Sequence, residues 1–499
     1  MRINVCEFYD KVLACWLGKN IGGTLGAPME WKRQKNNVSF YLQDLSGEPI
    51  PNDDLDLQLI YLKALEKHGS SLNAQILGEY WLNYQIADYS EYGIAKANMR
   101  AGFMPPISGT LNNQFKDSCG AFIRSEIFAC AFAGSPELAA KYCYEDGIVD
   151  HGNGEGTLAA IFIGAMEAAA FVESDLRKLI DIGLSYIPVD CGVAAAVKTA
   201  MECYDHGLAL DAARDLVLTR HRGSRFFNWD DHISKEDIEK GFDTGELGYD
   251  VPSNIAFIVA AILYGEGDFS KTICTAVNFG EDTDCTAATV GSIFGIIHGT
   301  KMIPEKWIEP IGHGIQTLCI NKTSFHDIPQ TVEELTERTV KLAQRFSLEF
   351  GLLNIFDDTP TEIDSGIDLY CNNKEQQKIF MPLNGPRYEN AALVCAVHYE
   401  KHTIKPGETV KVTLLFHNAQ NDKPQNILIS WKDANDFTVT PGKETSVLAI
   451  QSYINVPRVA AEFEVNVEDV KPKYEAVIEL SIPGRYTKLY VPIIFSCAK

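Results

Sequence analysis

Apolar residues recur at spacings of three and four along most of this chain, from Val5 to about Phe350. That spacing places them on one face of an α-helix. Many of the segments are rich in alanine and end at glycine, as closely packed helices do, and VAAAVKTAMECYDHG (193–207) is typical. The pattern predicts an all-α orthogonal bundle of about a dozen helices for this part of the chain.

The pattern changes after about residue 350, where β-branched and polar residues alternate. Segments such as TVKVTLLFHN and YEAVIELSI have the period of two expected of strands with one buried face, and turn-forming clusters such as KPGE separate them. We therefore expect a multi-domain α + β protein. Its predicted parts are a helical domain over residues 1–353, a linker or packing segment over 354–384, and an immunoglobulin-like β-sandwich over 385–499.

Acidic residues outnumber basic residues by 67 to 44, which gives the chain a formal charge of −23. This charge repels phosphate backbones and anionic lipid, so we expect neither a nucleic acid nor a membrane partner. The thirteen cysteines include no Cys-x-x-Cys pair, as is typical of proteins in a reducing compartment. Charges at Glu7, Asp10 and Lys11 interrupt what would be the apolar part of a signal peptide, and we expect a soluble cytoplasmic protein.

Two short polar clusters stand at the predicted starts of apolar helices: Asn52, Asp53 and Asp54, and then Asp282 and Asp284. At a helix start, neighbouring carboxylates can turn toward one point beside free N–H groups. Each cluster alone is most simply explained as a helix cap. Two such helix starts facing one another would instead bring together four carboxylates and an amide oxygen. That arrangement requires a cation, and oxygen ligands of this kind suit Mg²⁺, Mn²⁺ or Ca²⁺.

Three sequence blocks stand out in order along the chain: LGKNIGGTLGAPME (17–30), NDDLDLQL (52–59) and FGEDTDCTAATVGSIFGIIHG (279–299). In this order they resemble the signature blocks of the ADP-ribosylglycohydrolase (dinitrogenase-reductase-activating glycohydrolase) family. Between them, CGAFIRSEIFACAFAG and DGIVDHGNGEG look like two further segments of the family. The resemblance covers roughly residues 8–345, and the predicted β-domain is added after it.

This resemblance implies an all-helical fold that holds two divalent cations in a cleft, usually Mg²⁺ and alternatively Mn²⁺. The metal ligands that it implies are Asn52, Asp53, Asp54, Asp282 and Asp284. The residues assigned to catalysis are Glu30, Asp53 and Asp284. Either Glu30 or Asp53 would take the proton of the attacking water, and the sequence does not choose between them.

Two loops are candidates for substrate binding. Ser118 and Gly120 end a stretch of glycine and small polar residues that either lines the path of a pyrophosphate or forms a plain surface loop. His151, with Gly152 and Gly154, lies where the family places a histidine. Its ring and the glycine N–H groups could contact ribose or phosphate, and the alternative is a turn that leads into a helix.

Several residues depart from the common family pattern. Cys285 stands where many members have a threonine that joins the second metal. The thiol could bind a softer metal, leave the second ion with fewer protein ligands, or simply pack as a small apolar group. Asn52 replaces a hydroxyl residue, Gly23 stands where aspartate is frequent, and Glu281 where glycine is frequent. Arg124, a charge among apolar neighbours, is expected to form a structural ion pair with Glu126 or Asp150.

An aromatic cluster of Phe226, Phe227 and Trp229 could form a stacking wall for a base or sugar, although such clusters are more often part of a core. Together these features predict a divalent-metal-dependent hydrolase that cleaves the C1 glycosidic bond of an ADP-ribosyl or related ribosyl group. The substrate would be a small molecule or protein-linked ADP-ribose. One alternative is the same scaffold acting on a small glycoside or nucleoside, and another is a binding module without catalysis.

Overall fold

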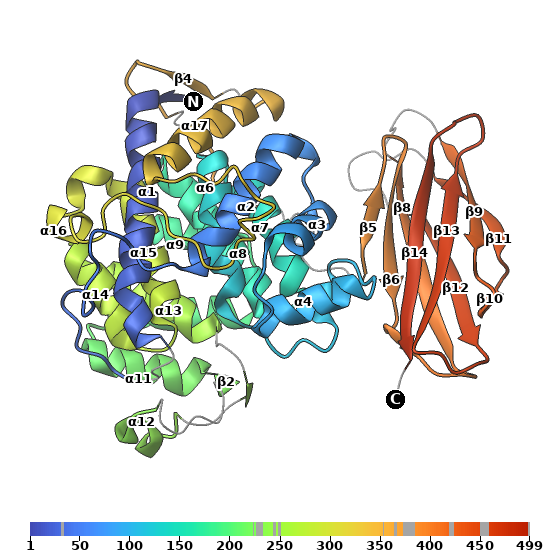
Figure 1. The fold of residues 1–499 in the computed structure, drawn as a ribbon, viewed down its shortest axis with the longest axis horizontal. Coiled ribbons are helices and arrows are strands. Elements are labelled where there is room, and N and C mark those ends of the chain that lie inside the picture. The colour runs from blue at the N-terminus through green and yellow to red at the C-terminus, as the bar shows by residue number, and fades with distance from the viewer. Residues whose placement is uncertain are drawn as a thin grey trace. The chain divides into compact units, whose positions relative to one another are not determined.

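The structure is a computed structural model, and the residues that it describes are 1–30, 34–222, 224–225, 233–242, 246–247, 251–352, 354–363, 367–372, 385–418, 424–449 and 459–497. The chain forms two compact units. The first unit comprises Met1–Lys96 and Asn112–Met381, and the second comprises Ala97–Leu111 and Pro382–Lys499. Figure 1 shows helices throughout the first unit and strands in the C-terminal part of the second.

Helices make up most of the first unit, as the apolar spacing predicts. The α-helices of the chain are α1 (Val5–Gly26), α2 (Asp53–His68), α3 (Ala74–Tyr84), α4 (Ser90–Arg100), α5 (Ile107–Thr110), α6 (Glu126–Ala131), α7 (Pro136–Asp150), α8 (Glu155–Ala170), α9 (Leu176–Ser185), α10 (Gly192–Asp205), α11 (Leu210–His221), α12 (Lys235–Glu239), α13 (Val251–Gly265), α14 (Phe269–Phe279), α15 (Thr283–His298), α16 (Glu305–Ile308) and α17 (Val332–Glu349). The 3-10 helices are η1 (Ala27–Met29), η2 (Gly69–Ser71), η3 (Cys119–Arg124) and η5 (Thr300–Met302). The predicted helical bundle is confirmed.

The core of the helical unit is built around three helices, α8, α13 and α15, nearly all of whose residues are buried. Apolar and small residues occupy all sides of each of these helices, as expected of helices in a protein interior. Helices α9 and α17 instead carry one apolar and one polar face, as outer helices do. Among the described residues, the structure contains no helix that combines the length and the apolar character needed to cross a bilayer.

Where the structure describes the helical unit, it also contains two short pairs of parallel strands. Strand β1 (Arg2–Asn4) pairs with β4 (Ile355–Asp357), which fixes the start of α1 beside the segment that follows α17. Strand β2 (Ser224–Arg225) pairs with β3 (Glu246–Leu247). The residues of the predicted aromatic cluster, Phe226, Phe227 and Trp229, lie outside the described residues.

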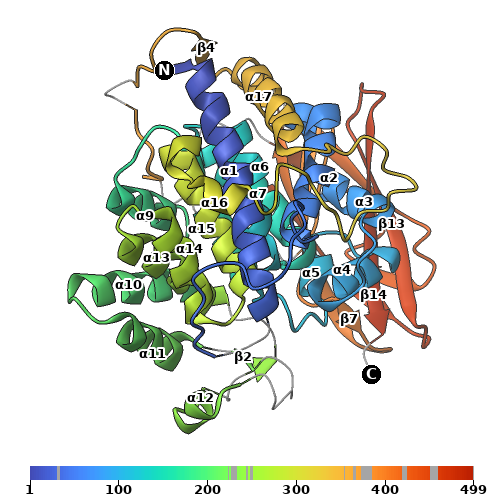
Figure 2. The same cartoon turned by 60° about the vertical axis from the view of Figure 1, so that its left-hand side comes forward.

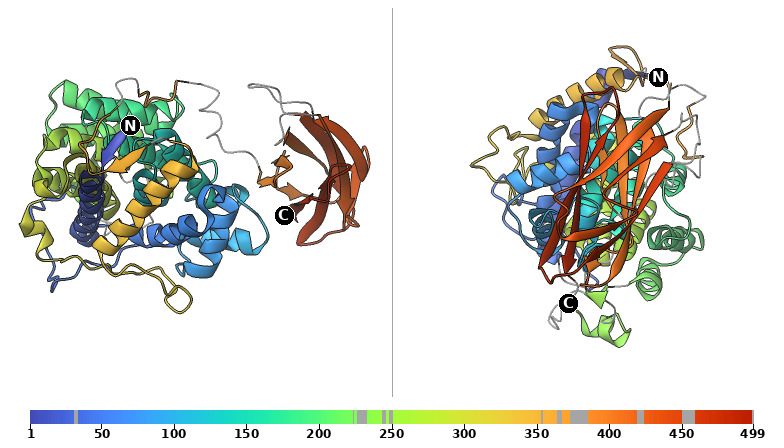
Figure 3. Two further views of the ribbon diagram at one scale, coloured as in Figure 1. Left: turned by 90° about the horizontal axis from the view of Figure 1, so that it is seen from above. Right: turned by 90° about the vertical axis from the view of Figure 1, so that its right-hand side faces the viewer.

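The described residues of the second unit form two five-stranded sheets, which confirms the predicted β-domain (Figure 3). One sheet has the order β10-β12-β8-β6-β5 and the other β11-β9-β13-β14-β7, and neighbouring strands are antiparallel except β14 and β7. The strands are β5 (Arg387–Glu389), β6 (Leu393–Tyr399), β7 (Thr403–Ile404), β8 (Thr409–Asn418), β9 (Gln425–Lys432), β10 (Phe437–Thr440), β11 (Glu444–Ala449), β12 (Val459–Val467), β13 (Lys473–Ser481) and β14 (Lys488–Cys497).

Alternating side chains from both sheets form the core of this unit, as in β12, where buried and exposed residues alternate. The core also includes Phe103 and Ile107 from the segment Ala97–Leu111. Gly102 of this segment approaches Ile494 so closely that a Cβ atom there would lie 2.7 Å from its Cδ1. The domain boundaries inferred from the sequence stay a prediction.

The β-sandwich is expected to lose stability as the pH falls from 6.5 to 4. Burial lowers the pKa of His402 to about 4, and its Nδ1 atom has no hydrogen-bond partner among the described residues. Between these pH values the imidazole of His402 takes up a proton in the unfolded chain but stays neutral in the native state. This difference lowers the free energy of unfolding by about 3 kcal/mol. Hydrogen exchange in β8 and β12 of the full-length protein, at both pH values, measures this loss. His402→Gln should reduce it, and an equal loss in the variant would contradict this assignment.

Candidate metal centre

Helices α1 and α15 lie against each other with their backbones in contact (Figure 2). A Cβ atom at Gly18 would lie 2.1 Å from the carbonyl oxygen of Gly291, and one at Gly22 would lie 2.1 Å from that of Ala287. The glycines of the first sequence block and the small residues of the last block are therefore what allows these helices to touch. This contact brings the end of α1 beside the start of α15.

Gly22→Ala is expected to destabilise the helical unit by about 1–3 kcal/mol, although alanine is the better helix former. The added methyl group would lie 2.1 Å from a backbone oxygen that cannot move independently of α15. Urea unfolding measures the effect. Gly314→Ala is the matched control, because a Cβ atom at that glycine meets nothing within 4 Å. Equal stability of the two variants would show that the helices do not depend on this close contact.

Three carboxylates converge where α1 ends and α15 begins. Glu30, Asp282 and Asp284 each offer an oxygen atom within 4.8 Å of the other two. The hydroxyl of Thr283 donates a hydrogen bond to Gly26 O at 2.8 Å, which ties the start of α15 to the end of α1. Asp282 is the N-cap residue of α15, but its side chain accepts no capping hydrogen bond. Its carboxylate is therefore not explained by capping.

A second group of ligand atoms shares Asp284 with the first. Asp54, Asp284 and Cys285 also offer atoms that lie within 4.8 Å of one another. The Cys285 Sγ atom lies 3.6 Å from Asp54 Oδ1. The start of α2 and the start of α15 therefore face each other, and the two acidic clusters recognised in the sequence lie together. The thiol that departs from the family pattern lies among the carboxylates.

These acids are buried and incompletely paired. Among the described residues, Asp54 Oδ2, Asp282 Oδ1 and Asp284 Oδ1 have no hydrogen-bond partner. Burial, and then the neighbouring charge of Asp284, raise the pKa of Asp282 well above its usual value. Burial also raises the pKa of Asp54 and of Asp284. Such a set of hard oxygen donors fits a divalent cation, which would pair these oxygens and remove the repulsion between them.

One lysine reaches this cluster from α1. Lys19 Nζ lies 3.7 Å from Asp54 Oδ2, but it lies only 2.7 Å from Glu126 Oε1. Its nearer partner is therefore Glu126, and Gln58 donates a further hydrogen bond to that carboxylate at 2.8 Å. Because Lys19 is shared with Glu126, it leaves the charges of Asp282 and Asp284 uncompensated.

Asn52 and Asp53 are oriented differently from Asp54. Asn52 Oδ1 accepts a hydrogen bond from Asp54 N at 2.8 Å and caps α2, while its Nδ2 donates to Asp284 Oδ2 at 3.3 Å. Its nitrogen, and not its oxygen, therefore faces Asp284. Asp53 belongs to neither group of converging ligands among the described residues. The roles of both residues as metal ligands stay predictions.

Two tyrosines that were not predicted from the sequence hold Asp53. The hydroxyl groups of Tyr92 and Tyr89 donate to Asp53 Oδ2 at 3.0 and 3.4 Å. They come from α4 and the loop before it, and their spacing of three residues in DYSEYG is too common to have indicated this contact. Burial raises the pKa of Asp53, and the two phenols oppose that shift.

Two departures from the family pattern are neighbours in space. A Cβ atom at Gly23 would lie 2.8 Å from Asn52 Nδ2, so a larger residue at position 23 would displace that amide. The missing side chain at Gly23 and the larger side chain at Asn52 therefore compensate each other. Glu281 has a φ of 66°, a conformation that explains why glycine is favoured there. Its buried carboxylate lies 3.2 Å from Arg222.

The predicted substrate loops meet around His151, whose ring is completely buried. Ser118 Oγ lies 3.0 Å from its Nε2, and Asp150 Oδ1 lies 2.8 Å from its Nδ1. A Cβ atom at Gly120 would lie 3.3 Å from the ring and 2.1 Å from Glu91 Oε1. Both ring nitrogens therefore face protein atoms, and a contact between this ring and a ligand stays a prediction.

The two predicted glycines beside this histidine shape the turn before α8. Gly152 has a φ of 49°, and Gly154 donates its N–H to His151 O at 2.8 Å. A Cβ atom at Gly154 would lie 2.0 Å from Lys116 O. These two glycines let the chain turn tightly into α8, which is the simpler of the two interpretations of this segment. Binding of substrate by their N–H groups stays a prediction.

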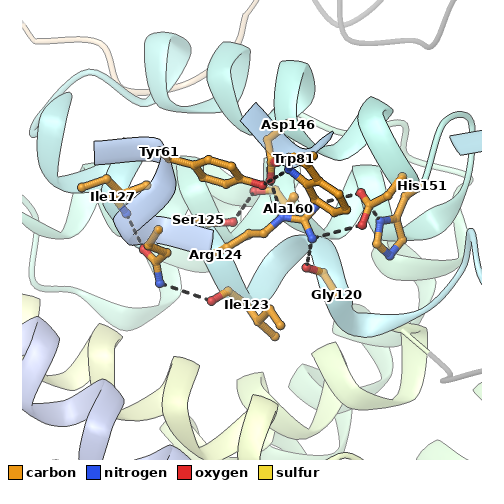
Figure 4. Close-up of polar contacts among 12 residues, drawn as sticks. Tyr61, Trp81, Gly120, Ile123, Arg124, Ser125, Ile127, Asp146, His151 and Ala160 are labelled. Atoms are coloured by element: carbon orange, nitrogen blue, oxygen red, sulfur yellow. Dashed lines mark hydrogen bonds and ion pairs between the residues drawn. The ribbon is translucent and has the colours of Figure 1, made fainter. Parts of the chain in front are cut away.

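Arg124 lies at the centre of a buried polar network (Figure 4). It donates to Asp146 at 2.7 Å and to Asp150 at 2.6 and 3.1 Å. A further hydrogen bond at 2.6 Å reaches Gly120 O, which fixes the loop beside His151. The predicted ion pair with Asp150 is confirmed, and the pair with Glu126 is wrong because that carboxylate binds Lys19.

The helical part of the chain is similar to known proteins. A family model described as ADP-ribosylglycohydrolase matches residues 6–347. An uncharacterized protein of Archaeoglobus fulgidus is 24% identical over 345 residues, which is 67% of this chain and 99% of that protein. A solved structure described as an ADP-ribosylglycohydrolase-related protein complex is 16% identical, with a TM-score of 0.42, over 68% of this chain and 99% of that chain. The family match ends within α17, before β5 begins.

Proposed function

Because the chain belongs to the ADP-ribosylglycohydrolase family, we propose that it is a divalent-metal-dependent hydrolase that cleaves the C1 glycosidic bond of an ADP-ribosyl or related ribosyl group. The observation that carries this proposal is the convergence of buried carboxylate oxygens from Asp54, Asp282 and Asp284, three of which have no hydrogen-bond partner among the described residues. Burying such charges is costly unless a bound cation compensates them.

The proposed chemistry divides between the cations and the protein. Divalent cations bound there would coordinate the hydroxyl groups of the sugar and lower the pKa of a bound water molecule. Asp54, Asp282 and Asp284 would hold the cations, and Mg²⁺ or Mn²⁺ suits their oxygen atoms. The close contact between α1 and α15 keeps these carboxylates in register with Glu30.

Glu30 is the better candidate for the general base. Its carboxylate lies in the same group as Asp282 and Asp284, so it is beside any water held there. Asp53, the other candidate, has Oδ2 engaged by Tyr92 and Tyr89. We therefore assign to Glu30 the proton of the attacking water, and to Asp53 an orienting role maintained by the two phenols.

Glu30→Gln is expected to lower kcat by about 100-fold, the smaller end of the range for loss of a general base. Cation binding should weaken but remain measurable, because Glu30 is one of the converging oxygen donors and Asp54, Asp282 and Asp284 remain. Steady-state kinetics and calorimetric titration with Mg²⁺ separate the two effects. Asp53→Asn is the companion variant, and a larger loss of kcat in it than in Glu30→Gln would reverse the assignment.

The substrate class is tested by incubating the protein with ADP-ribosylated protein, ADP-ribose derivatives and a set of small ribosides, each with Mg²⁺, with Mn²⁺ and with a chelator. Release of ADP-ribose that stops in the chelator supports the proposal. Turnover of the small ribosides alone favours the same scaffold acting on free glycosides. Binding of ADP-ribose without turnover of any substrate would contradict the proposed hydrolase and favour a binding module.

A further inference from the structure

The side chain of Cys285 lies where a metal ligand would lie. The sequence alone does not decide whether its thiol binds a metal or packs as a small apolar group. Cys285 is the third residue of α15 and follows Asp284 directly. Its Sγ atom lies 3.6 Å from Asp54 Oδ1, and both atoms lie within 4.8 Å of a carboxylate oxygen of Asp284. The thiol thus lies among acids from two different helices and not in an apolar pocket.

The distance between sulfur and oxygen fits a shared ion. A zinc-type ion lies about 2.3 Å from a thiolate sulfur and about 2.1 Å from a carboxylate oxygen, so a tetrahedral angle separates the two ligand atoms by about 3.6 Å. Cys285 Sγ, which donates a hydrogen bond to Asp54 Oδ1, lies at this separation from it, and a bound ion would take the place of that proton. Lys19 approaches the other oxygen of Asp54, Oδ2, at 3.7 Å, which leaves Oδ1 to face the thiol.

A second observation also points to an ion at this place. Asp284 Oδ1 and Asp282 Oδ1 are buried and have no hydrogen-bond partner among the described residues. Asp54, Asp284 and Cys285 therefore offer three converging ligand atoms, one of which is sulfur, and Asp282 lies in the neighbouring group that shares Asp284. All-oxygen sites suit Mg²⁺, whereas a thiolate ligand favours softer first-row cations such as Zn²⁺, Fe²⁺ or Co²⁺.

We propose that Cys285 is a direct ligand of one of the two cations, and that it makes this centre select a thiophilic divalent ion such as Zn²⁺ or Fe²⁺ over Mg²⁺. This inference rests on the metal centre of the proposed function and adds the identity of one ligand and the class of ion. Glu30 and the oxygen ligands keep the roles proposed above.

The test uses Co²⁺, because a thiolate bound to cobalt gives a charge-transfer band in the near ultraviolet and oxygen ligands do not. The full-length protein is freed of metal and titrated with Co²⁺ without oxygen. The wild type should show the band. Cys285→Thr and Cys285→Ser should bind Co²⁺ without it. The control is Cys274→Ser, a half-buried cysteine on α14 that belongs to neither ligand group, and it should keep the band.

Competition titrations give the second readout. In Cys285→Thr, the preference for Zn²⁺ over Mg²⁺ should fall at least about tenfold, the factor that 1.4 kcal/mol produces. If both Cys285 variants fail to fold, X-ray absorption of the zinc-loaded wild type decides, because a sulfur neighbour at about 2.3 Å is distinct from oxygen.

The possible failures are distinguishable. Binding of Co²⁺ to the wild type without a charge-transfer band, or an unchanged ion preference in Cys285→Thr, overturns the role of Cys285 and leaves the proposed hydrolase standing. A protein that binds neither Co²⁺ nor Mg²⁺ nor Zn²⁺ overturns both proposals together.

Discussion

Replacing Asp284 by asparagine is expected to remove cation binding and to lower turnover by about 10⁴-fold or more. Asp284 belongs to both groups of converging ligands, one with Glu30 and Asp282 and one with Asp54 and Cys285. Its loss therefore weakens both positions at which a cation would bind. A cation that activates water and stabilises developing charge contributes several kcal/mol, and each 1.36 kcal/mol is a factor of ten in rate. Initial rates and calorimetric titration with Mg²⁺ and Mn²⁺ measure the two effects.

The same substitution is expected to raise the stability of the cation-free protein. Burial, and then the charge of Asp53, raise the pKa of Asp284, so its charged form is unfavourable without a cation. An amide of the same shape removes that charge. The melting temperature in a chelator should therefore exceed that of the wild type, and added Mg²⁺ should raise it only in the wild type.

The control for this variant is Asp190→Asn, which changes an exposed acid and should alter neither rate nor stability. A soluble Asp284→Asn variant that keeps its turnover would contradict the proposed metal centre. So would a variant that melts below the wild type in a chelator, because the buried carboxylates would then not repel one another.

The helical part of the site could be anticipated because its signals are local. An acid cluster before an apolar run marks a helix start whatever the rest of the chain does, and Asp54, Asp282 and Asp284 all lie at helix starts. Glycines spaced four apart, as at Gly18 and Gly22, indicate a face that another backbone can approach. Each of these inferences depends on a few neighbouring residues.

The buried ion pairs could not be anticipated, because their partners come from distant parts of the chain. Lys19 on α1 contacts Glu126 on α6, more than a hundred residues away, and no spacing in the sequence connects them. A charge within an apolar helix shows only that some partner must exist. Both Glu126 and Asp150 satisfied that condition for Arg124, and only the fold decides between them.

Replacing Arg124 by methionine is expected to lower the free energy of unfolding of the helical unit by about 3–5 kcal/mol. The guanidinium group is completely buried and neutralises Asp146 and Asp150 at once. Burial raises the pKa of Asp146 to about 6 even with Arg124 present. For Asp150, burial also acts to raise the pKa, but Arg124 and then His151 outweigh it and hold the pKa below its usual value. Without the arginine, two carboxylates would remain buried with little compensation.

The pH dependence of the stability shows whether uncompensated buried carboxylates cause this loss. In Arg124→Met, the native acids bind protons more tightly than the unfolded chain does, so stability should fall as the pH rises from 5 to 8 more steeply than in the wild type. Urea unfolding of the full-length protein, with hydrogen exchange in α7, measures it. Arg177→Met is the matched control, because its pair with Asp205 is partly exposed to solvent and should contribute at most about 1 kcal/mol. If the two variants lose equal stability, or if the loss in Arg124→Met does not depend on pH, the buried carboxylates do not need the arginine.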